Sequence, residues 1–257
     1  MERLREQRTS GVNGSFIRAI AMVLLAMGVV GRGLIQSHLL GMGTVTGEEL
    51  LQTMQNSSTA MILATVSLVF QAMEACAAPL FVFLLVEGFR HTSSLKNYVL
   101  RVLGLAVLCE IPYNLAMSGK LLDFGSRNPV FGLVVGLVVL YMYRFYQAKS
   151  FRNLLIKALV TVAALIWPLM LKVDSGICLV FLVCVMWAFR KIANFRHLAG
   201  ATSAMACSLI SPFYLAAPMS FLVLHFHNGE QGDSNRMINY LAYPVILLAV
   251  AALRLVF

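Results

Sequence analysis

Apolar residues fill long uninterrupted stretches of the chain, and short polar segments separate them. The stretches lack the alternation of apolar and polar residues that marks a half-buried strand, so the pattern predicts helices. A window of about 19 residues, the length that crosses a bilayer, marks eight of them. The predicted spans are 16–35, 59–89, 98–117, 129–146, 154–171, 175–189, 198–225 and 237–256.

Prolines complicate two of these spans. Pro79 lies near the middle of 59–89, which is longer than a bilayer requires, and predicts a kinked or strongly tilted helix. Pro212 and Pro218 interrupt 198–225. That stretch is either one broken crossing or two short segments that do not cross.

The composition supports the same class of fold. Hydrophobic residues make up 60% of the chain, charged residues 12%, and the mean hydropathy is +0.81. A water-soluble domain of this size needs more polar surface, and a nucleic-acid partner is not expected for so apolar a chain. We therefore expect an all-α, polytopic helical membrane bundle of about eight transmembrane helices, forming a single domain over 1–257, with membrane lipids around it.

Lysine and arginine residues are unevenly divided between the predicted loops. If the amino terminus is cytoplasmic and eight spans cross, 15 of the 20 basic residues fall on the cytoplasmic side. This asymmetry is what orients helical membrane proteins. Two crossings in place of 198–225 would exchange Arg236 and Arg254 between the sides without improving the count. Eight crossings is the simpler arrangement, and it predicts that the carboxyl terminus is also cytoplasmic.

Carboxylates inside the predicted spans are the first candidates for function, because a charge at the bilayer centre costs roughly 3 kcal/mol unless it has a partner or a role. Glu74 and Glu110 lie well inside their spans, and Glu87 lies one turn from a span end. The simplest role for Glu87 is an ion pair with Arg90 or Arg101.

A second interpretation of Glu87 involves His91, four residues later. Residues at this spacing share one helix face, so the carboxylate could orient the imidazole as a general base. The alternative is a helix end in water, where a histidine has no special role.

Polar residues also mark two turns. In the run EIPYNLA, Pro112 frees backbone carbonyls beside Glu110, Tyr113 and Asn114, which suits the lining of a cavity as well as a structural kink. In KVDSG, Asp174 is placed to cap the next helix, and Gly176 permits close helix packing. The five cysteines have no metal-ligand spacing, and no metal site is predicted.

One block of the chain resembles a known family. The run AAPLFVFLLVEGFRHTSSLKNYVLRVLGLAVLCEIPYNLA, from Ala77 to Ala116, is similar to the central block of the TraX family. NPVFGLVVG from Asn128, DSGI from Asp174 and HNGEQG from His227 resemble later family segments, in the same order. The resemblance covers most of the chain.

The resemblance implies an integral membrane protein, similar to N-acetyltransferases, that takes an acyl group from acetyl-CoA. It implies a place in the bacterial inner membrane and an amine or hydroxyl acceptor, which could be a protein or a peptide. For such an enzyme we expect His91 as the base with Glu87 orienting it. Because basic residues cluster beside this pair, we expect Arg90, Lys96 or Arg101 to bind the phosphates of coenzyme A. The expected cavity-lining residues are Glu74, Glu110, Tyr113, Asn114, Asn128 and Asp174.

The chain also departs from the family pattern. Gly28 and Val29 stand where relatives carry Asp-His, Glu74 and Ala75 stand where they tend to carry Gly-Arg, and no histidine follows Pro244. If the Asp-His pair supplies the base, this chain lacks it. The alternative function is therefore a catalytically degenerate relative that binds a lipid, a peptide or a partner membrane protein.

Overall fold

The computed structural model describes residues 11–41, 57–148, 150–232 and 236–256, with positions 48, 52 and 55 between the first two ranges. Within these residues the chain is helical, apart from isolated bridges that pair Val12 with His227 and Arg127 with Val173. The longer elements are α2 (Gly14–Val29), the π-helix η1 (Val30–Leu39), α4 (Ser58–His91), α5 (Leu95–Ser118), α6 (Val130–Phe145), α7 (Phe151–Met170), α8 (Gly176–Ala188), α9 (Ala193–Ala206) and α11 (Arg236–Val256).

Short polar residues define where the helices begin and end. The Asn13 side chain accepts a hydrogen bond from the Phe16 backbone, and Ser57 and Ser94 cap α4 and α5 in the same way. Gly119 ends α5 in the left-handed conformation, with φ of 72°. The predicted boundaries agree with the observed ones to within four residues for every span except 198–225.

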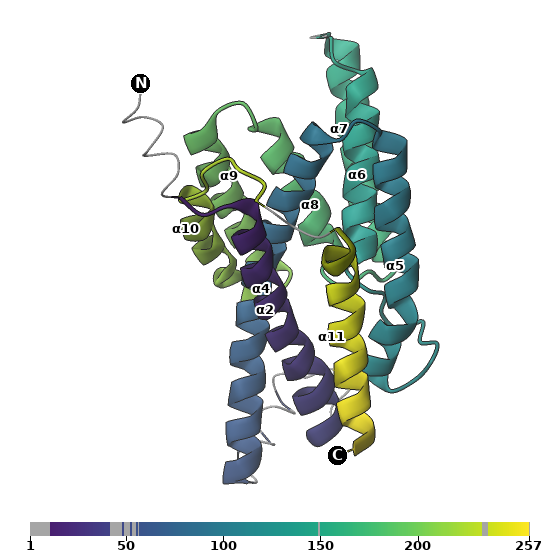
Figure 1. Cartoon of the computed structure of the whole chain (residues 1–257), viewed down its shortest axis with the longest axis vertical. Coiled ribbons are helices and arrows are strands. Elements are labelled where there is room, and N and C mark those ends of the chain that lie inside the picture. Colours follow the sequence, from purple (N-terminus) through teal and green to yellow (C-terminus); the bar gives the residue numbers. More distant parts are fainter. Residues whose placement is uncertain are drawn as a thin grey trace.

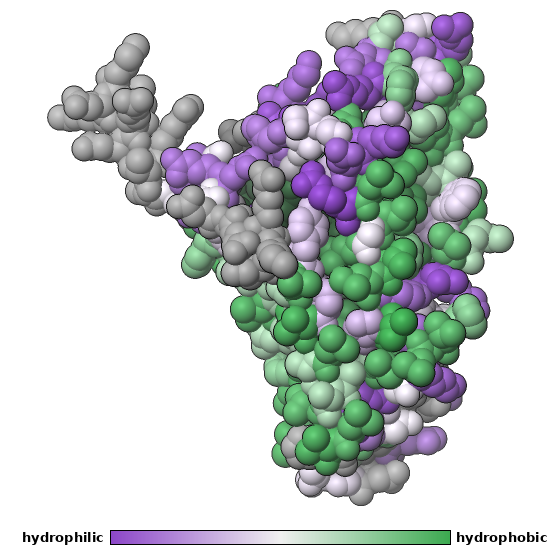
Figure 2. Space-filling view, turned by 45° about the vertical axis from the view of Figure 1, so that its right-hand side comes forward, coloured by the Kyte–Doolittle hydropathy of each residue, from purple (hydrophilic) through white to green (hydrophobic). Residues whose placement is uncertain are grey.

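The surface of the bundle is that of a membrane protein. Three helices and the continuous α2–η1 segment are long and apolar enough to cross a bilayer, and shorter apolar helices accompany them. α7 exposes a row of large apolar side chains: Leu154, Leu155, Leu159, Val162 and Ile166. In Figure 2 hydrophobic residues cover much of the visible surface, and hydrophilic residues gather mainly near the top. The chain is therefore a multi-pass helical membrane protein.

The helices surround α4, which packs against α2, η1, α6 and α8 and runs unbroken through Pro79. α11 lies between α2 and α5 (Figure 1), whereas α6 packs against α5 and α8, and α8 packs against α4 and α9. We call the end of the bundle that carries Gly14 and His91 the mouth end, and the end that carries Leu39 and Ser118 the far end.

The segment 198–225 does not cross the bundle once, as eight spans would require. α9 enters from the mouth end, three short 3-10 helices (Cys207–Leu209, Pro212–Leu215 and Ala217–Met219) turn the chain, and α10 (Ser220–His225) returns. His197 and His225 lie with ring centroids 6.4 Å apart, so the two arms end at the same level. The turn reaches the middle of α4, where Cys76 donates to Ala216 O at 3.1 Å. Pro212 and Pro218 suit this re-entrant segment because each lies in the first two positions of a 3-10 turn, where a missing backbone N–H costs no hydrogen bond.

The re-entrant segment reverses the expected direction of the last helix. The Gly14 backbone donates to Glu230 O at 2.8 Å, which holds the loop before α11 at the mouth end. At the other end of α11, Arg254 donates to Ala116 O at 2.8 Å, at the far end. Gly14 and Val256 thus lie at opposite ends of the bundle (Figure 1), whereas eight crossings would place them at the same end. Arg236 and Arg254 exchange sides, so the charge asymmetry is unchanged.

Four of the 15 basic residues expected on the cytoplasmic side, Arg3, Arg5, Arg8 and Lys149, lie outside the described residues.

Reporter fusions test the re-entrant topology. A reporter fused after the last residue is expected on the opposite side of the membrane from one fused at the amino terminus, because seven crossings separate them. A fusion within the loop 228–232 is expected on the same side as the amino terminus. Paired reporters that are active on only one side of the membrane provide the measurement, and a carboxyl terminus on the amino-terminal side would contradict the structure.

Candidate functional site

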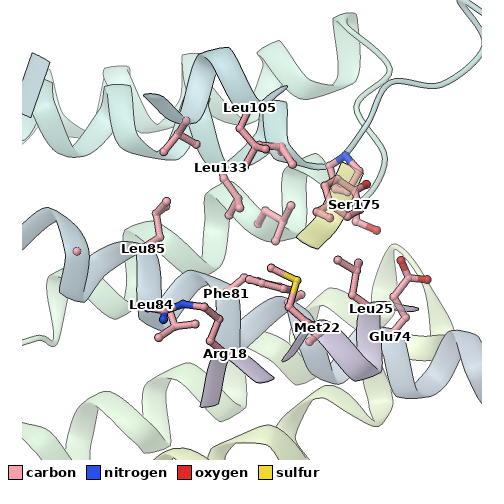
Figure 3. A pocket seen from close by; sticks show the side chains of 18 of the residues that line it. Arg18, Met22, Leu25, Glu74, Phe81, Leu84, Leu85, Leu105, Leu133 and Ser175 are labelled. Atoms are coloured by element: carbon pink, nitrogen blue, oxygen red, sulfur yellow. The ribbon is translucent and has the colours of Figure 1, made fainter. Parts of the chain in front are cut away.

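A cavity of about 640 Å³ opens among α2, α4, α5, α6, α8 and α11, and the re-entrant segment contributes Phe213 and Tyr214. Its lining changes character along its length. In Figure 3 Arg18 and Glu74 lie apart, with apolar side chains around the space between them. The cavity therefore has a cationic mouth, an apolar wall and a charged floor.

The mouth carries Arg18 on α2, His91 at the end of α4 and Arg101 on α5, together with Tyr98 and Tyr240. Arg18 Nη1 is buried without a hydrogen-bond partner in the described part of the chain. Arg101 is exposed and donates through Nε to Asn97 O at 3.2 Å. Both guanidinium groups belong to residues that line the mouth, so an anionic group bound there would lie beside two cationic side chains.

The wall between mouth and floor is apolar. It consists of Met22, Leu25, Phe81, Leu84, Leu85, Leu105 and Leu133, among others. Arg18 and Arg32 are fourteen residues apart on the continuous α2–η1 segment, which corresponds to roughly 20 Å at a helical rise of about 1.5 Å per residue. A narrow molecule with an anionic head and a long flexible arm matches these dimensions.

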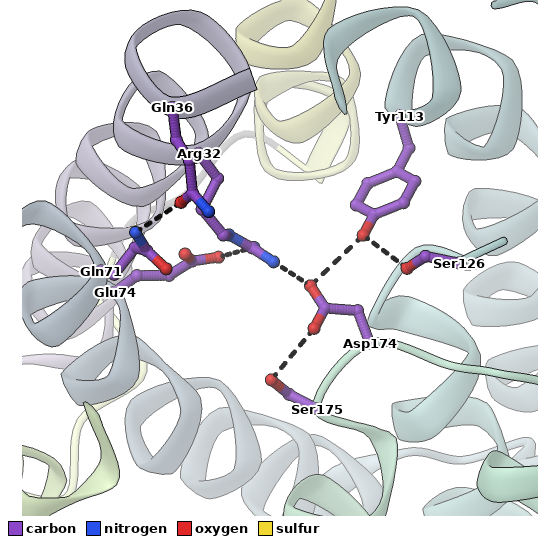
Figure 4. Close-up of polar contacts among 8 residues, drawn as sticks. All are labelled: Arg32, Gln36, Gln71, Glu74, Tyr113, Ser126, Asp174 and Ser175. Carbon is purple, nitrogen blue, oxygen red and sulfur yellow. Dashed lines mark hydrogen bonds and ion pairs between the residues drawn. The ribbon is translucent and has the colours of Figure 1, made fainter. Parts of the chain in front are cut away.

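The floor is an ion cluster in which one arginine joins two carboxylates (Figure 4). Arg32 Nη2 lies 2.5 Å from Glu74 Oε1, and Arg32 Nη1 pairs with Asp174 Oδ2. Tyr113 also donates to Asp174 Oδ2 at 3.3 Å, and its hydroxyl lies 3.1 Å from Ser126 Oγ. The cluster thereby connects η1, α4, α5 and the turn before α8.

Unusual backbone places the two sides of this cluster. Arg32 is on the π-helix, which Ser67 ties to α4 by donating to Gly31 O at 2.8 Å. Asp174 lies between Lys172 and Ser175, whose φ values of 52° and 53° are left-handed. Such conformations cost of order 1 kcal/mol or more each and often occur at functional sites.

Gly28 explains how Glu74 reaches the floor. A β-carbon at residue 28 would overlap Oε2, Cδ and Cβ of Glu74, so no other residue fits beside this glutamate. Gly28 and Glu74 are two of the positions at which the sequence was expected to depart from the pattern that it resembles. The structure shows that these two departures are neighbours, and that a carboxylate from α4 fills space that a side chain on α2 would otherwise occupy.

The predicted cavity-lining residues divide into two groups. Glu74 and Asp174 line the cavity, and Tyr113 bonds Asp174 behind it. Glu110, Asn114 and Asn128 are not among the lining residues. Glu110 accepts from Asn128 Nδ2 at 2.7 Å and from Arg127 Nη1 at 3.3 Å, which fastens the α5–α6 connection to α5.

Asp174 does not cap α8, contrary to the simpler interpretation of the KVDSG turn. Its oxygens accept from Arg32, Tyr113 and Ser175. The expected close packing at Gly176 is confirmed, because a β-carbon on Gly132 of α6 would lie 2.9 Å from the Gly176 Cα.

Glu87 and His91 contact each other at 3.5 Å, as the four-residue spacing predicts. The carboxylate is shared, however: it binds Arg90 at 2.9 Å and Arg196 of α9 at 3.0 Å. Its predicted partner Arg90 is confirmed, whereas Arg101 bonds the backbone instead. Of the predicted phosphate-binding residues, Arg101 lines the mouth, and Arg90 and Lys96 do not.

Sequence reasoning missed Arg18, Arg32, Tyr98, Tyr240 and Tyr243 as cavity residues. Arg32 carried a usable signal. It lies inside a predicted span, where an arginine needs an acidic partner, and two buried carboxylates elsewhere in the chain were still unassigned. Counting Arg32 with the basic residues of the loops obscured its pairing with Glu74 and Asp174.

The fold and the cavity define a class: a multi-pass helical membrane protein with a deep, charged pocket open at one end. The chain belongs to the TraX family, because the family model described as "TraX protein" matches residues 14–254, nearly the whole chain. No curated protein and no solved structure matches it.

The ion cluster should make a large contribution to stability. Arg32→Ala is expected to lower the free energy of unfolding by about 3 kcal/mol, because it leaves two carboxylates unpaired away from water. Denaturant unfolding in mild detergent measures the change. Arg101→Ala is the control, since this arginine is exposed and, in the described structure, pairs with no carboxylate: it donates to Asn97 O and lies over the Tyr98 ring. Equal stability of the two variants would contradict a structural role for the cluster.

Proposed function

We propose that this protein is a membrane acyltransferase that moves an acetyl or other short acyl group from acyl-CoA to an amine or hydroxyl acceptor. The observation that carries the proposal is the order of chemistry along the cavity: cations at the mouth, an apolar wall, and a charged floor roughly 20 Å deeper by helical rise. An acyl-CoA has the same order of chemical groups, from its phosphates along the pantetheine arm to the thioester.

In this arrangement Arg18 and Arg101 bind the phosphates of the donor, since guanidinium groups pair well with phosphate oxygens. The pantetheine arm lies along Met22, Leu25, Leu105 and Leu133. The thioester then reaches the floor, away from bulk water. A mouth on the cytoplasmic side of a bacterial inner membrane would give access to cytosolic acyl-CoA, and this orientation agrees with the excess of basic residues at that end.

His91 receives a different role here from the one that its spacing to Glu87 suggests. It lies seventeen residues from Glu74 on α4, about 25 Å along the helix, and its side chain is 58% exposed. A donor bound as proposed places its phosphates, and not its thioester, near His91. We therefore assign His91 to the donor-binding mouth.

Calorimetry in detergent tests donor binding. We expect micromolar affinity for acetyl-CoA, roughly −8 kcal/mol, and similar affinity for coenzyme A, because the phosphates provide most of the contacts. Arg18→Ala combined with Arg101→Ala should weaken binding at least tenfold. Arg144→Ala is the matched control, an exposed arginine of the mouth-end part of α6 outside the cavity lining.

The outcome also separates the two functions. Donor binding together with release of coenzyme A in the presence of an acceptor supports the transferase. A protein that binds no coenzyme A and instead retains a lipid or a partner protein would favour the degenerate binding protein.

Steady-state kinetics test the role of His91. His91→Ala should raise the KM for acetyl-CoA several-fold with a much smaller change in kcat, because the imidazole contacts the donor far from the reacting carbon. A loss of kcat of a hundredfold or more at saturating donor would instead make His91 the base, as the sequence suggested.

A further inference from the structure

The two carboxylates of the floor have unequal surroundings. Asp174 accepts hydrogen bonds from Arg32, Tyr113 and Ser175, so both of its oxygens are occupied. Glu74 accepts one, from Arg32 to Oε1, and Oε2 has no hydrogen bond from any described residue. Two neighbouring carboxylates in different environments commonly divide their roles between a fixed charge and a proton-transferring group.

The carboxyl group of Glu74 is directed toward the cavity. Glu74 is a lining residue, and its carboxyl group points into the space drawn in Figure 3. Oε2 packs over Gly28, where the absence of a side chain leaves room for the carboxyl group beside α2. The paired oxygen Oε1 meanwhile fixes the orientation of the carboxylate through Arg32, 2.5 Å away.

We propose that Glu74 is the general base of acyl transfer, with Arg32 and Asp174 as positioning residues. The assignment rests on the proposed function. Glu74 Oε2 takes the proton from the acceptor N–H or O–H as the nucleophile attacks the thioester carbon. The new C–N or C–O bond forms, the C–S bond breaks, and the proton passes from Glu74 to the departing sulfur, which leaves as the thiol of coenzyme A. Glu74 is then an unprotonated carboxylate again.

Arg32 and Asp174 keep this base usable. Arg32 is shared between two carboxylates, so neither carboxylate alone neutralises its charge. One guanidinium nitrogen of Arg32 pairs with Asp174, and the other orients Glu74. Tyr113 and Ser126 hold Asp174 from behind. Glu74 is thus fixed in orientation while one of its oxygens stays open to the acceptor.

The first test is Glu74→Gln, measured as coenzyme A release from acetyl-CoA with hydroxylamine as a small acceptor. We expect kcat to fall at least a hundredfold, the usual range for loss of a general base, with acetyl-CoA binding within threefold of wild type. Glu110→Gln is the matched control. Its carboxylate is as buried as that of Glu74, 14% against 15% exposed, and is also paired with one arginine, but lies outside the cavity lining.

The second test moves the carboxylate to the facing helix. Glu74→Gly should abolish turnover, and Gly28→Asp in the same chain should restore at least a tenth of it, because a side chain at residue 28 enters the space that the Glu74 carboxyl group occupies. Gly28→Asp alone should be inactive or poorly folded, since both groups compete for that space. Glu74→Gln also distinguishes a general base from a residue that only pairs with Arg32. For a base, we expect this variant to keep acetyl-CoA binding and the thermal transition of the wild type but to lose turnover.

The outcomes separate the two proposals. Turnover by Glu74→Gln within threefold of wild type overturns the assignment of Glu74 and leaves the transferase standing. A Glu74→Gly chain that stays folded and gains nothing from Gly28→Asp argues against Glu74 in the same way. Wild-type protein that neither binds nor cleaves acetyl-CoA overturns both proposals together.

Discussion

The structure depends on one arginine held between two carboxylates inside a lipid-facing bundle. Arg32 joins Glu74 and Asp174, and through them it connects the first crossing, the central helix and the turn before α8. Charges away from water are tolerated only when paired, so this cluster fixes how these three elements meet. It also forms the floor of the cavity, so the same interaction orders the fold and places charged groups inside the cavity. Left-handed backbone on both sides of Asp174 and the π-helix around Arg32 are local costs of bringing the charges together.

The cavity gains its chemical gradient from the way α4 passes through the bundle. This helix is 34 residues long and contributes Glu74 to the floor, Phe81, Leu84 and Leu85 to the wall and His91 to the mouth. Successive turns of α4 line the cavity at successive depths. The apolar wall therefore separates the charged floor from the cationic mouth. The re-entrant segment closes the side of the cavity near mid-depth with Phe213 and Tyr214, without adding another crossing. Family membership and this gradient together support the proposed acyl transfer.

Much of this protein is determined by its sequence alone. Long apolar stretches fix the helices and their approximate ends, because a bilayer leaves the backbone no other regular way to cross. The four-residue spacing of Glu87 and His91 gives their contact, and the central block from Ala77 to Ala116 gives the family. The embedded Glu74 marks a site because a carboxylate in a span needs a partner.

Tertiary structure decided the rest, since it depends on contacts between residues far apart in the chain. Hydropathy does not distinguish a stretch that crosses from one that enters and returns, and only the level of His197 beside His225 settles the path of 198–225. The sequence does not say which carboxylates Arg32 joins, because its partners lie 42 and 142 positions away. Residues 28 and 74 look unrelated along the chain. Only packing brings them into one contact between α2 and α4, because a side chain at residue 28 would need the volume that Glu74 fills.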